Sequence, residues 1–217
     1  MKHKGLLIVV SGFSGAGKGT LMKKLLEDYE QYALSISMTT RAPREGEVDG
    51  REYFFATREQ FEDRIKQGGF IEYAQYCENY YGTPKNYVAQ QLEAGKDVIL
   101  EIEIQGAMKV KEQFPDAVLL FVMPPSISVL HQRLVGRGTE TEEVIMARLQ
   151  RAEEEAVGIE EYDYIIVNDD LDACVKELHE LITKTHEEIQ TQYNPANYKK
   201  LIENIRTELR SLVKGEK

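Results

Sequence analysis

The junction between a short apolar run and a glycine-rich loop constrains the fold of this chain more than any other feature of its sequence. Residues 6–10 are all Leu, Ile or Val, and such a run predicts a buried strand. The glycines that follow let the backbone curl around an anion, and residues 20–26 are predicted to form a helix whose N-terminus faces the same charge. Strand, glycine loop, lysine and helix together predict a P-loop that binds a nucleoside triphosphate. The residues expected to bind ATP or GTP are Gly12, Phe13, Ser14, Gly15, Ala16, Gly17, Lys18, Gly19 and Thr20.

The metal-binding position of this loop departs from the usual pattern. P-loops place Ser or Thr directly after the lysine, where the hydroxyl reaches Mg²⁺. Here Gly19 follows Lys18, and the hydroxyl comes one residue later, at Thr20. Thr20 is therefore the candidate metal ligand, and the alternative is an ion held largely through water, which suits the reluctance of Mg²⁺ to dehydrate.

Length, charge and cysteine content limit the class of protein. A chain of 217 residues can bury a good core in one domain, with inserted lobes, and its net charge of −10 argues against a general nucleic-acid binder. Cys77 and Cys174 lie far apart in the sequence, which indicates reduced thiols rather than a disulfide framework. Because we find neither a leader peptide nor a run of about 20 apolar residues, we expect a cytoplasmic protein with no membrane or nucleic-acid partner. Monomer and homodimer are both open.

Strands alternate with helices along most of the chain. Apolar runs predict further buried strands over 98–100, 117–122 and 164–167, and a shorter strand at Ile36. Helical patterns cover 127–134, 142–157 and 171–189. This alternation predicts an α/β fold in which a parallel sheet is flanked by helices, with the ligand at the carboxyl ends of the strands.

Two segments fall outside this alternation. Residues 38–89 are rich in Tyr, Phe, Gly and charge, and they predict an inserted lobe of short antiparallel strands that include 52–55 and 70–74. After a break at Asn194 and Pro195, the tail carries one apolar stripe at helical spacing: Tyr198, Leu201, Ile202, Ile205, Leu209 and Leu212. We expect this helix to dock on the domain or on a second copy. The alternative, a site for an acidic partner or a membrane surface, is less favoured because the basic excess is small.

The lobe opens with a candidate phosphate clamp. Arg41 and Arg44 follow several hydroxyl residues, and arginine forks make paired, charge-assisted bonds to phosphate. Tyr53 and Tyr81 carry phenolic donors suited to the same anion. A solvated polar loop is the alternative interpretation of this segment alone.

Taken with the P-loop, further motifs make the sequence similar to the guanylate kinase family over about residues 5–187. The segments that carry the resemblance are 37–47, 70–74, 79–83, 100–106, 133–141 and 167–171. The resemblance implies a core (5–37, 90–130 and 159–187), a GMP-binding lobe (38–89), a helical lid (131–158) and a C-terminal helical extension (188–217) that the family leaves out.

The resemblance also implies roles for individual residues in transfer of a phosphoryl group from ATP to GMP with Mg²⁺. The phosphate of GMP would be held by Ser37, Arg41, Arg44, Tyr53 and Tyr81, and its base by Glu72, Thr83 and Glu103. Arg133, Arg137 and Arg148 would close over the triphosphate, with Arg137 nearer the adenine and Asn168 also on the adenine side. Glu101 would orient an arginine or a water of the magnesium ion. Lys18, Arg41, Arg133 and Arg148 are the implied catalytic residues.

The residue types at the implied base site favour guanine on chemical grounds. Guanine presents N–H donors at N1 and N2, which suit the carboxylates of Glu72 and Glu103, and an acceptor at O6, which suits the hydroxyl of Thr83. Adenine would leave a buried carboxylate unpaired, and such sites discriminate by orders of magnitude. The family usually has Asp where Glu103 stands, so the reach of that carboxylate differs.

Two other functions compete with a GMP kinase. The first is a binding module that has lost catalysis, but such domains would be expected to lose the P-loop lysine or the lid arginines, all of which are present. The second is a related P-loop kinase with another phosphorylated acceptor, against which the base-site residues argue.

Overall fold

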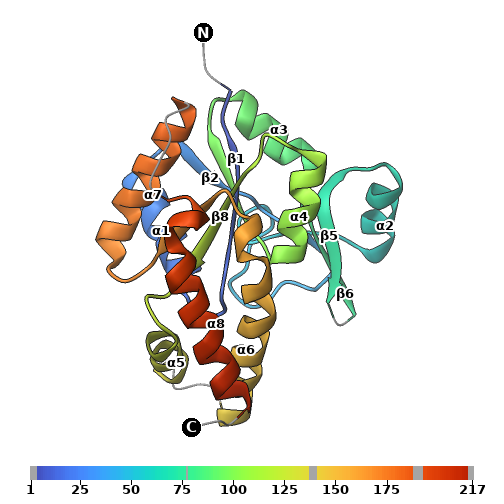
Figure 1. The fold of residues 1–217 in the computed structure, drawn as a ribbon. Helices are drawn as coiled ribbons and strands as arrows, with labels where there is room; N and C mark the ends of the chain where they lie inside the picture. Colours follow the sequence, from blue (N-terminus) through green and yellow to red (C-terminus); the bar gives the residue numbers. More distant parts are fainter. Residues whose placement is uncertain (1–3, 77, 137–140, 188–192, 215–217) are drawn as a thin grey trace. The chain divides into compact units, whose positions relative to one another are not determined.

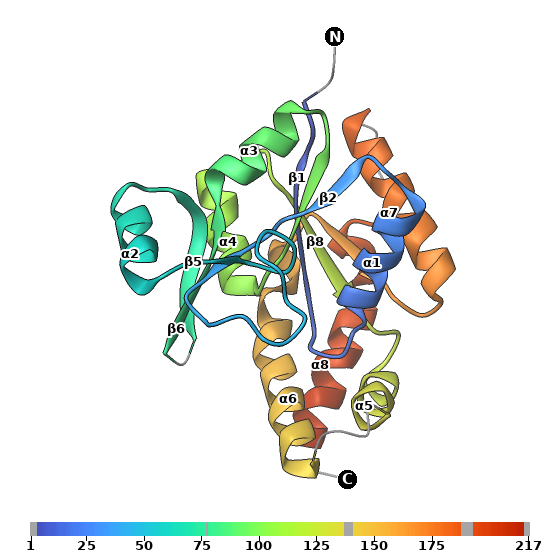
Figure 2. The same ribbon diagram turned by 180° about the vertical axis from the view of Figure 1, so that it is seen from behind.

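The structure is a computed structural model that describes residues 4–76, 78–136, 141–187 and 193–214. Arg137 and Cys77, singled out above, lie outside these ranges. Contacts divide the chain into two compact units, Met1–Val9 with Tyr29–Ala117 and Val10–Asp28 with Val118–Lys217. Figures 1 and 2 show the ribbon from two sides.

A five-stranded sheet has the order β2-β7-β1-β8-β9. Its strands are β1 (Leu7–Gly12), β2 (Tyr32–Leu34), β7 (Asp97–Glu101), β8 (Val118–Met123) and β9 (Tyr164–Val167). The pairs β2/β7 and β8/β9 are parallel, and β8 is buried along its whole length, as expected of a strand covered on both faces. The prediction of an α/β fold with a parallel sheet flanked by helices is confirmed. The strand predicted at Ile36 is wrong, because this residue lies in the connection that leaves β2 and enters a second sheet.

The second sheet belongs to the first unit and has the order β4-β3-β6-β5. It contains β3 (Met38–Thr39), β4 (Phe54–Phe55), β5 (Phe70–Tyr76) and β6 (Asn79–Pro84). The pairs β3/β6 and β5/β6 are antiparallel as predicted, but β3 and β4 run parallel, because the chain makes a long excursion between them and returns in the same direction.

Three helices of the first unit were not predicted: α2 (Arg58–Lys66), α3 (Lys85–Glu93) and α4 (Ile104–Gln113). Helix α2 packs on the lobe through Phe61, whose fully buried ring stacks on Phe70 and on Tyr80 at centroid distances of 4.3 Å and 5.2 Å. The inserted lobe therefore has its own small aromatic core.

The second unit holds the remaining helices. They are α1 (Lys18–Asp28), α5 (Ile127–Val135), α6 (Glu142–Glu155), the 3₁₀ helix η1 (Ala156–Glu161), α7 (Leu171–His186), the 3₁₀ helix η2 (Pro195–Tyr198) and α8 (Lys199–Lys214). Helix α6 ends at Glu155, two residues before the predicted end, because the chain tightens into η1. The predicted end of α7 at residue 189 lies outside the described residues.

The tail helix α8 lies alongside α6 in both views (Figures 1 and 2). Ile202, Ile205 and Leu209 of its apolar stripe are buried. The predicted docking of this helix on the chain is confirmed. No helix in the described ranges is both long and apolar enough to cross a membrane.

Candidate active site

The glycine loop of the second unit is held in a conformation that other residues rarely adopt. Gly12, Gly15 and Gly17 have φ values of 152°, 92° and 91°. A Cβ at Gly12 would lie 2.1 Å from the Val122 carbonyl oxygen, and one at Gly17 would lie 2.6 Å from Asn168 Nδ2. Both the curl and the close packing of this loop therefore require glycine.

The side chain of Lys18 folds back onto the glycine loop. Its Nζ donates to the carbonyl oxygens of Gly12 at 2.6 Å and of Phe13 at 3.1 Å. Lys18 is also the first residue of α1, so the ammonium and the positive end of the helix dipole lie together at the loop. This arrangement favours an anion such as a phosphate.

The side chain of Phe13 belongs to the core. It is fully buried, and its ring meets Phe121 of β8 edge to face with centroids 5.2 Å apart. Phe121 makes a similar contact with Tyr162, at 5.1 Å. Phe13 is one of the predicted nucleotide-binding residues. Because its ring lies in the core, only its backbone is available to a phosphate.

The predicted lid residues contact the loop directly. Arg148 of α6 donates from Nη1 to the Ser14 hydroxyl at 2.6 Å. Arg133 of α5 donates to the Ala16 carbonyl at 3.3 Å and to the Asn168 carbonyl at 2.8 Å. Two guanidinium groups are therefore placed at the phosphate loop.

Asn168 is buried directly after β9 and donates from Nδ2 to the Ala16 carbonyl at 2.8 Å. Its amide therefore supports the backbone of the glycine loop. The predicted role of Asn168 toward adenine stays a prediction.

The position expected to hold the metal is open. Gly19 and Thr20 are both exposed, and a Cβ at Gly19 would meet nothing within 4 Å. Within the described ranges, His, Cys, Asp and Glu form no group of three or more that could hold a metal ion. The protein would therefore supply one exposed hydroxyl, with phosphate oxygens and water as the other ligands. This set of ligands fits Mg²⁺ and does not fit a cation that needs protein ligands on all sides.

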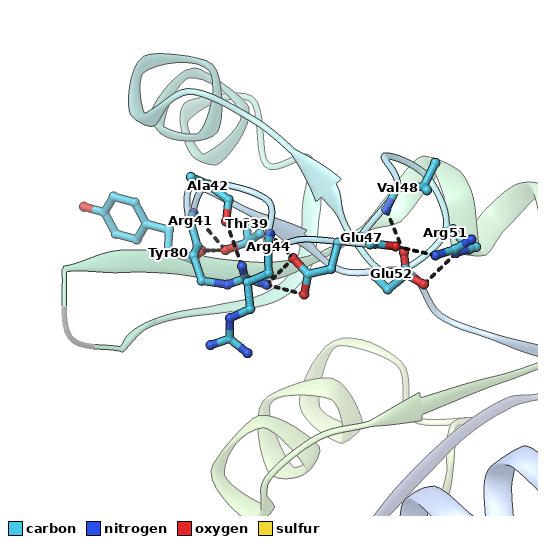
Figure 3. A network of polar contacts seen from close by, with 10 residues as sticks. Thr39, Arg41, Ala42, Arg44, Glu47, Val48, Arg51, Glu52 and Tyr80 are labelled. Atoms are coloured by element: carbon cyan, nitrogen blue, oxygen red, sulfur yellow. Dashed lines mark hydrogen bonds and ion pairs between the residues drawn. The ribbon is translucent and has the colours of Figure 1, made fainter.

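In the first unit, the predicted phosphate clamp is organised by a carboxylate (Figure 3). Arg41 Nη2 donates to both oxygens of Glu47, at 2.8 Å and 3.0 Å, and the Arg44 backbone N–H donates to the same carboxylate at 2.8 Å. Hydrogen bonds from Arg41 and from the Arg44 backbone hold the pKa of Glu47 below its ordinary value. The carboxylate of Glu47 thus holds the side chain of Arg41 and the backbone of Arg44.

The rest of the clamp surrounds the Arg41 guanidinium. Its Cζ lies 5.4 Å from the centroid of the Tyr53 ring, which meets the Tyr81 ring edge to face with centroids 6.1 Å apart. The guanidinium of Arg44 points away from Glu47 (Figure 3), and among the described residues it makes no hydrogen bond or ion pair. This leaves Arg44 available to an anionic ligand.

The predicted base site has a paired carboxylate and hydroxyl. The Thr83 hydroxyl on β6 donates to Glu72 Oε1 on β5 at 2.8 Å. The register of this strand pair shifts between Phe70 and Tyr73, which places Glu72 at the irregularity. Burial raises the pKa of Glu72, although the Thr83 hydrogen bond and the charge of Lys109 oppose the shift.

The remaining predicted acceptor residues lie at the ends of elements of the same unit. Glu101 is the last residue of β7, Glu103 is the N-cap of α4, and both are exposed. Ser37 directly precedes β3, and its carbonyl accepts from the Phe54 N–H at 2.8 Å.

The sequence model of the family described as guanylate kinase matches residues 4–185. This chain belongs to the guanylate kinase family. The match ends before η2 and α8, which lie outside the family's sequence model.

Individual guanylate kinases are similar over most of their length. The guanylate kinase of Oceanobacillus iheyensis is 48% identical over 204 residues, covering 94% of this chain and 98% of that protein. That of Lactococcus lactis is 51% identical over 186 residues, covering 86% and 91%. A crystal structure of guanylate kinase from Anaplasma phagocytophilum superposes with a TM-score of 0.65 at 33% identity, covering 88% of this chain and 89% of that one.

Within this guanylate kinase fold, Glu47 is the functional candidate that sequence reasoning did not single out. It lies six residues after Arg41 in an irregular loop, where no helical or strand periodicity indicates which side chains meet. Its opposite charge close to two arginines was the available signal.

Proposed function

We propose that this chain is a guanylate kinase that transfers the γ-phosphoryl group of ATP to GMP, giving ADP and GDP. The observation that carries the choice of acceptor is the contact between Thr83 and Glu72, at 2.8 Å. A partly buried carboxylate beside a rotatable hydroxyl complements the Watson–Crick edge of guanine.

Guanine binding is proposed to exchange the partners of this pair. The N1 and N2 donors of guanine would bond the Glu72 carboxylate, and the Thr83 hydroxyl would turn to donate to O6. Adenine, with an acceptor at N1 and no 2-amino group, would leave Glu72 unpaired, so we expect strong discrimination against AMP. Ser37, Glu101 and Glu103 are proposed to complete the GMP site.

The acceptor needs no general base. A phosphate monoester has a second pKa of about 6, so it is largely a dianion at neutral pH and attacks as it is. The proposed task of Arg41, Arg44, Tyr53 and Tyr81 is to hold that dianion in line with the bond that breaks. Closure over both nucleotides would keep water from competing as the acceptor.

On the donor side, the proposed roles follow the positive charges around the loop. The loop N–H groups and Lys18 would bind the β- and γ-phosphates, while Arg133 and Arg148 would stabilise the charge that develops on the transferred group. Mg²⁺, when bound through Thr20 or its water, would neutralise the phosphate oxygens. Arg137 and Asn168 are proposed to lie on the adenine side.

We further infer a cytoplasmic enzyme. Cys174 is a buried free thiol, which suits a reducing compartment where ATP and GMP occur.

The test is release of ADP in a coupled assay with GMP, dGMP, AMP and UMP as acceptors. We expect turnover with GMP and dGMP, and turnover with AMP and UMP that is lower by about 10²-fold or more. Turnover with another phosphorylated acceptor alone would replace GMP in the proposal, and absence of turnover with nucleotide binding retained would favour a binding module.

A further inference from the structure

The tail helix α8 makes polar contacts with the start of α5 and with the end of α6, the two helices that carry the predicted lid arginines. Arg206 reaches the end of α6, where its Nε and Nη2 donate to the Ala156 carbonyl at 2.9 Å and 2.6 Å. Nη2 also donates to the Val157 carbonyl at 3.3 Å, and the guanidinium pairs with both oxygens of Glu160, with Nη1 2.5 Å from Oε1. Ala156 is fully buried, so Arg206 brings a charged donor to a carbonyl that is shielded from solvent.

The other lid helix is contacted at its start. The Ile127 backbone N–H, at the first position of α5, donates to Glu208 Oε2 at 3.3 Å. Helix α8 thus presents a negative charge to the positive end of α5 and a positive charge to the negative end of α6. Both placements are electrostatically favourable, and both come from residues two positions apart on one helix.

These contacts lie on the same helices that carry the arginines of the nucleotide loop. Arg133 lies on α5 and reaches Ala16, while Arg148 lies on α6 and reaches Ser14. The buried face of α8, with Ile202, Ile205 and Leu209, packs along α6. Fixing one end of a rigid helix fixes the position of a side chain farther along it, because helices move largely as units.

From this geometry we propose that α8 is a positioning element of the ATP lid, with Arg206 as its main positioning residue and Glu208 as the second. Helix α8 fixes the positions of α5 and α6. Because Arg133 and Arg148 lie on these helices, it also fixes their positions relative to the bound triphosphate. The inference rests on the proposed function for the identity of the nucleotide, and it assigns a role to a segment outside the family's sequence model.

The experiment compares the full chain with Arg206→Ala, measuring the affinity for a fluorescent ATP analogue and the KM for ATP and for GMP. We expect Arg206→Ala to weaken the analogue and raise the KM for ATP about 10-fold, with the KM for GMP changed less than about 2-fold, because displacement of a distant support misplaces the lid arginines. Arg206→Lys should recover part of the loss, since an ammonium keeps the charge and lacks the planar fork.

Arg210→Ala is the matched control, because Arg210 lies on the same helix, is 62% exposed in its side chain and approaches Glu153 only to 4.0 Å. It should behave as the unsubstituted chain. If Arg206→Ala does not fold, Glu208→Ala serves as the second variant, because Glu208 is exposed. It should again raise the KM for ATP more than the KM for GMP, with a smaller effect.

Equal rises in both KM values, or a lower melting temperature with unchanged nucleotide affinity, would overturn the proposal and leave α8 as a stabilising helix. Analogue binding keeps this test separate from the proposed function. A chain that binds the analogue but does not phosphorylate GMP contradicts the proposed function, while the Arg206 variants still decide the role of α8.

Discussion

Glu47 holds Arg41 in a two-point contact, with the guanidinium Nη2 2.8 Å and 3.0 Å from the two carboxylate oxygens. The side chains of the pair are only 16% and 17% exposed, so solvent and salt screen it less than a surface ion pair. The same carboxylate accepts the backbone N–H of Arg44. One residue therefore organises the phosphate clamp.

Replacement of Glu47 by Gln should raise the KM for GMP by about 10-fold and leave the KM for ATP unchanged. The amide loses the charge that pairs with the Arg41 guanidinium and weakens the bond to the Arg44 backbone, so part of the binding energy of the phosphate is spent on ordering this loop. Steady-state kinetics with each substrate varied in turn would measure this.

Glu52→Gln is the matched control for Glu47. Glu52 also pairs with an arginine, Arg51, and accepts a backbone N–H, that of Val48, but it lies apart from Arg41 (Figure 3). A comparable KM change in both variants would mean that the effect of Glu47 is a general loosening of the loop.

Replacement of Glu72 by Gln should raise the KM for GMP by about 10²-fold or more, with the KM for ATP unchanged. An amide offers one acceptor and places its own donors against those of guanine, which leaves polar groups unpaired. Glu78→Gln, in the turn of the same hairpin, serves as the control. Equal losses for both nucleotides would show that Glu72 does not read the base.

Guanosine affinity should fall as pH falls through the raised pKa of Glu72. Burial raises that pKa above its ordinary value of 4.5, so the carboxyl of the free protein takes up a proton at higher pH than an exposed one. Since guanine donors bond the ionised form, binding and proton release are linked. The same shift affects folding: the free energy of unfolding should fall as pH rises from 4.5 through the raised pKa, because the folded protein then holds a buried charge.

Calorimetry with guanosine between about pH 5 and 8 would measure this linkage, because guanosine lacks the phosphate that titrates near pH 6. Glu72→Gln removes the titrating group and should flatten the dependence. An unchanged slope in that variant would assign the pH effect to another group.

Replacement of Lys18 by Ala should lower kcat by about 10²- to 10³-fold, since it removes a positive charge from the proposed position of the β- and γ-phosphates. The fold should persist, because Lys18 contributes contacts to carbonyls of its own loop. Lys23→Ala, with a side chain 78% exposed on the same helix, should match the unsubstituted chain. Substantial residual turnover in Lys18→Ala, with circular dichroism unchanged, would contradict the assignment.

Replacement of Thr20 by Val should raise the Mg²⁺ concentration for half-maximal turnover by about 10-fold if its hydroxyl ligates the ion. Gly19 has open space where a Cβ would stand, so Gly19→Ser in the Thr20→Val background should restore Mg²⁺ affinity. Thr20→Ser keeps a hydroxyl and is the control. No shift in Thr20→Val would mean that the ion is held through water.

The strands of the parallel sheet were predictable because each is a continuous apolar run. The strand predicted over 164–167 is observed as β9 (Tyr164–Val167), and the run at 117–122 is observed as β8 one residue further on. Strands buried on both faces carry this signal along their whole length.

The helices of the first unit were missed for a different reason. Helix α2 is mainly polar, with Phe61 as its buried residue, so it lacks an apolar stripe. Its start carries a readable signal, the capping box formed by Thr57 and Gln60. Helix α4 begins at Ile104, and its N-cap residue Glu103 makes no side-chain cap bond, so the start of this helix is weakly marked.

The sequence by itself determined the phosphate loop, because strand, glycines, Lys18 and helix are contiguous and their geometry follows from local backbone preferences. It also determined the residue types of the acceptor site. Tertiary structure decided which side chains meet: Phe13 turns into the core against Phe121, Thr83 pairs with Glu72 across a register shift, and Arg206 reaches Ala156, fifty positions away along the chain. Such partners are chosen by the packing of segments distant in sequence, and local preferences carry no record of that packing.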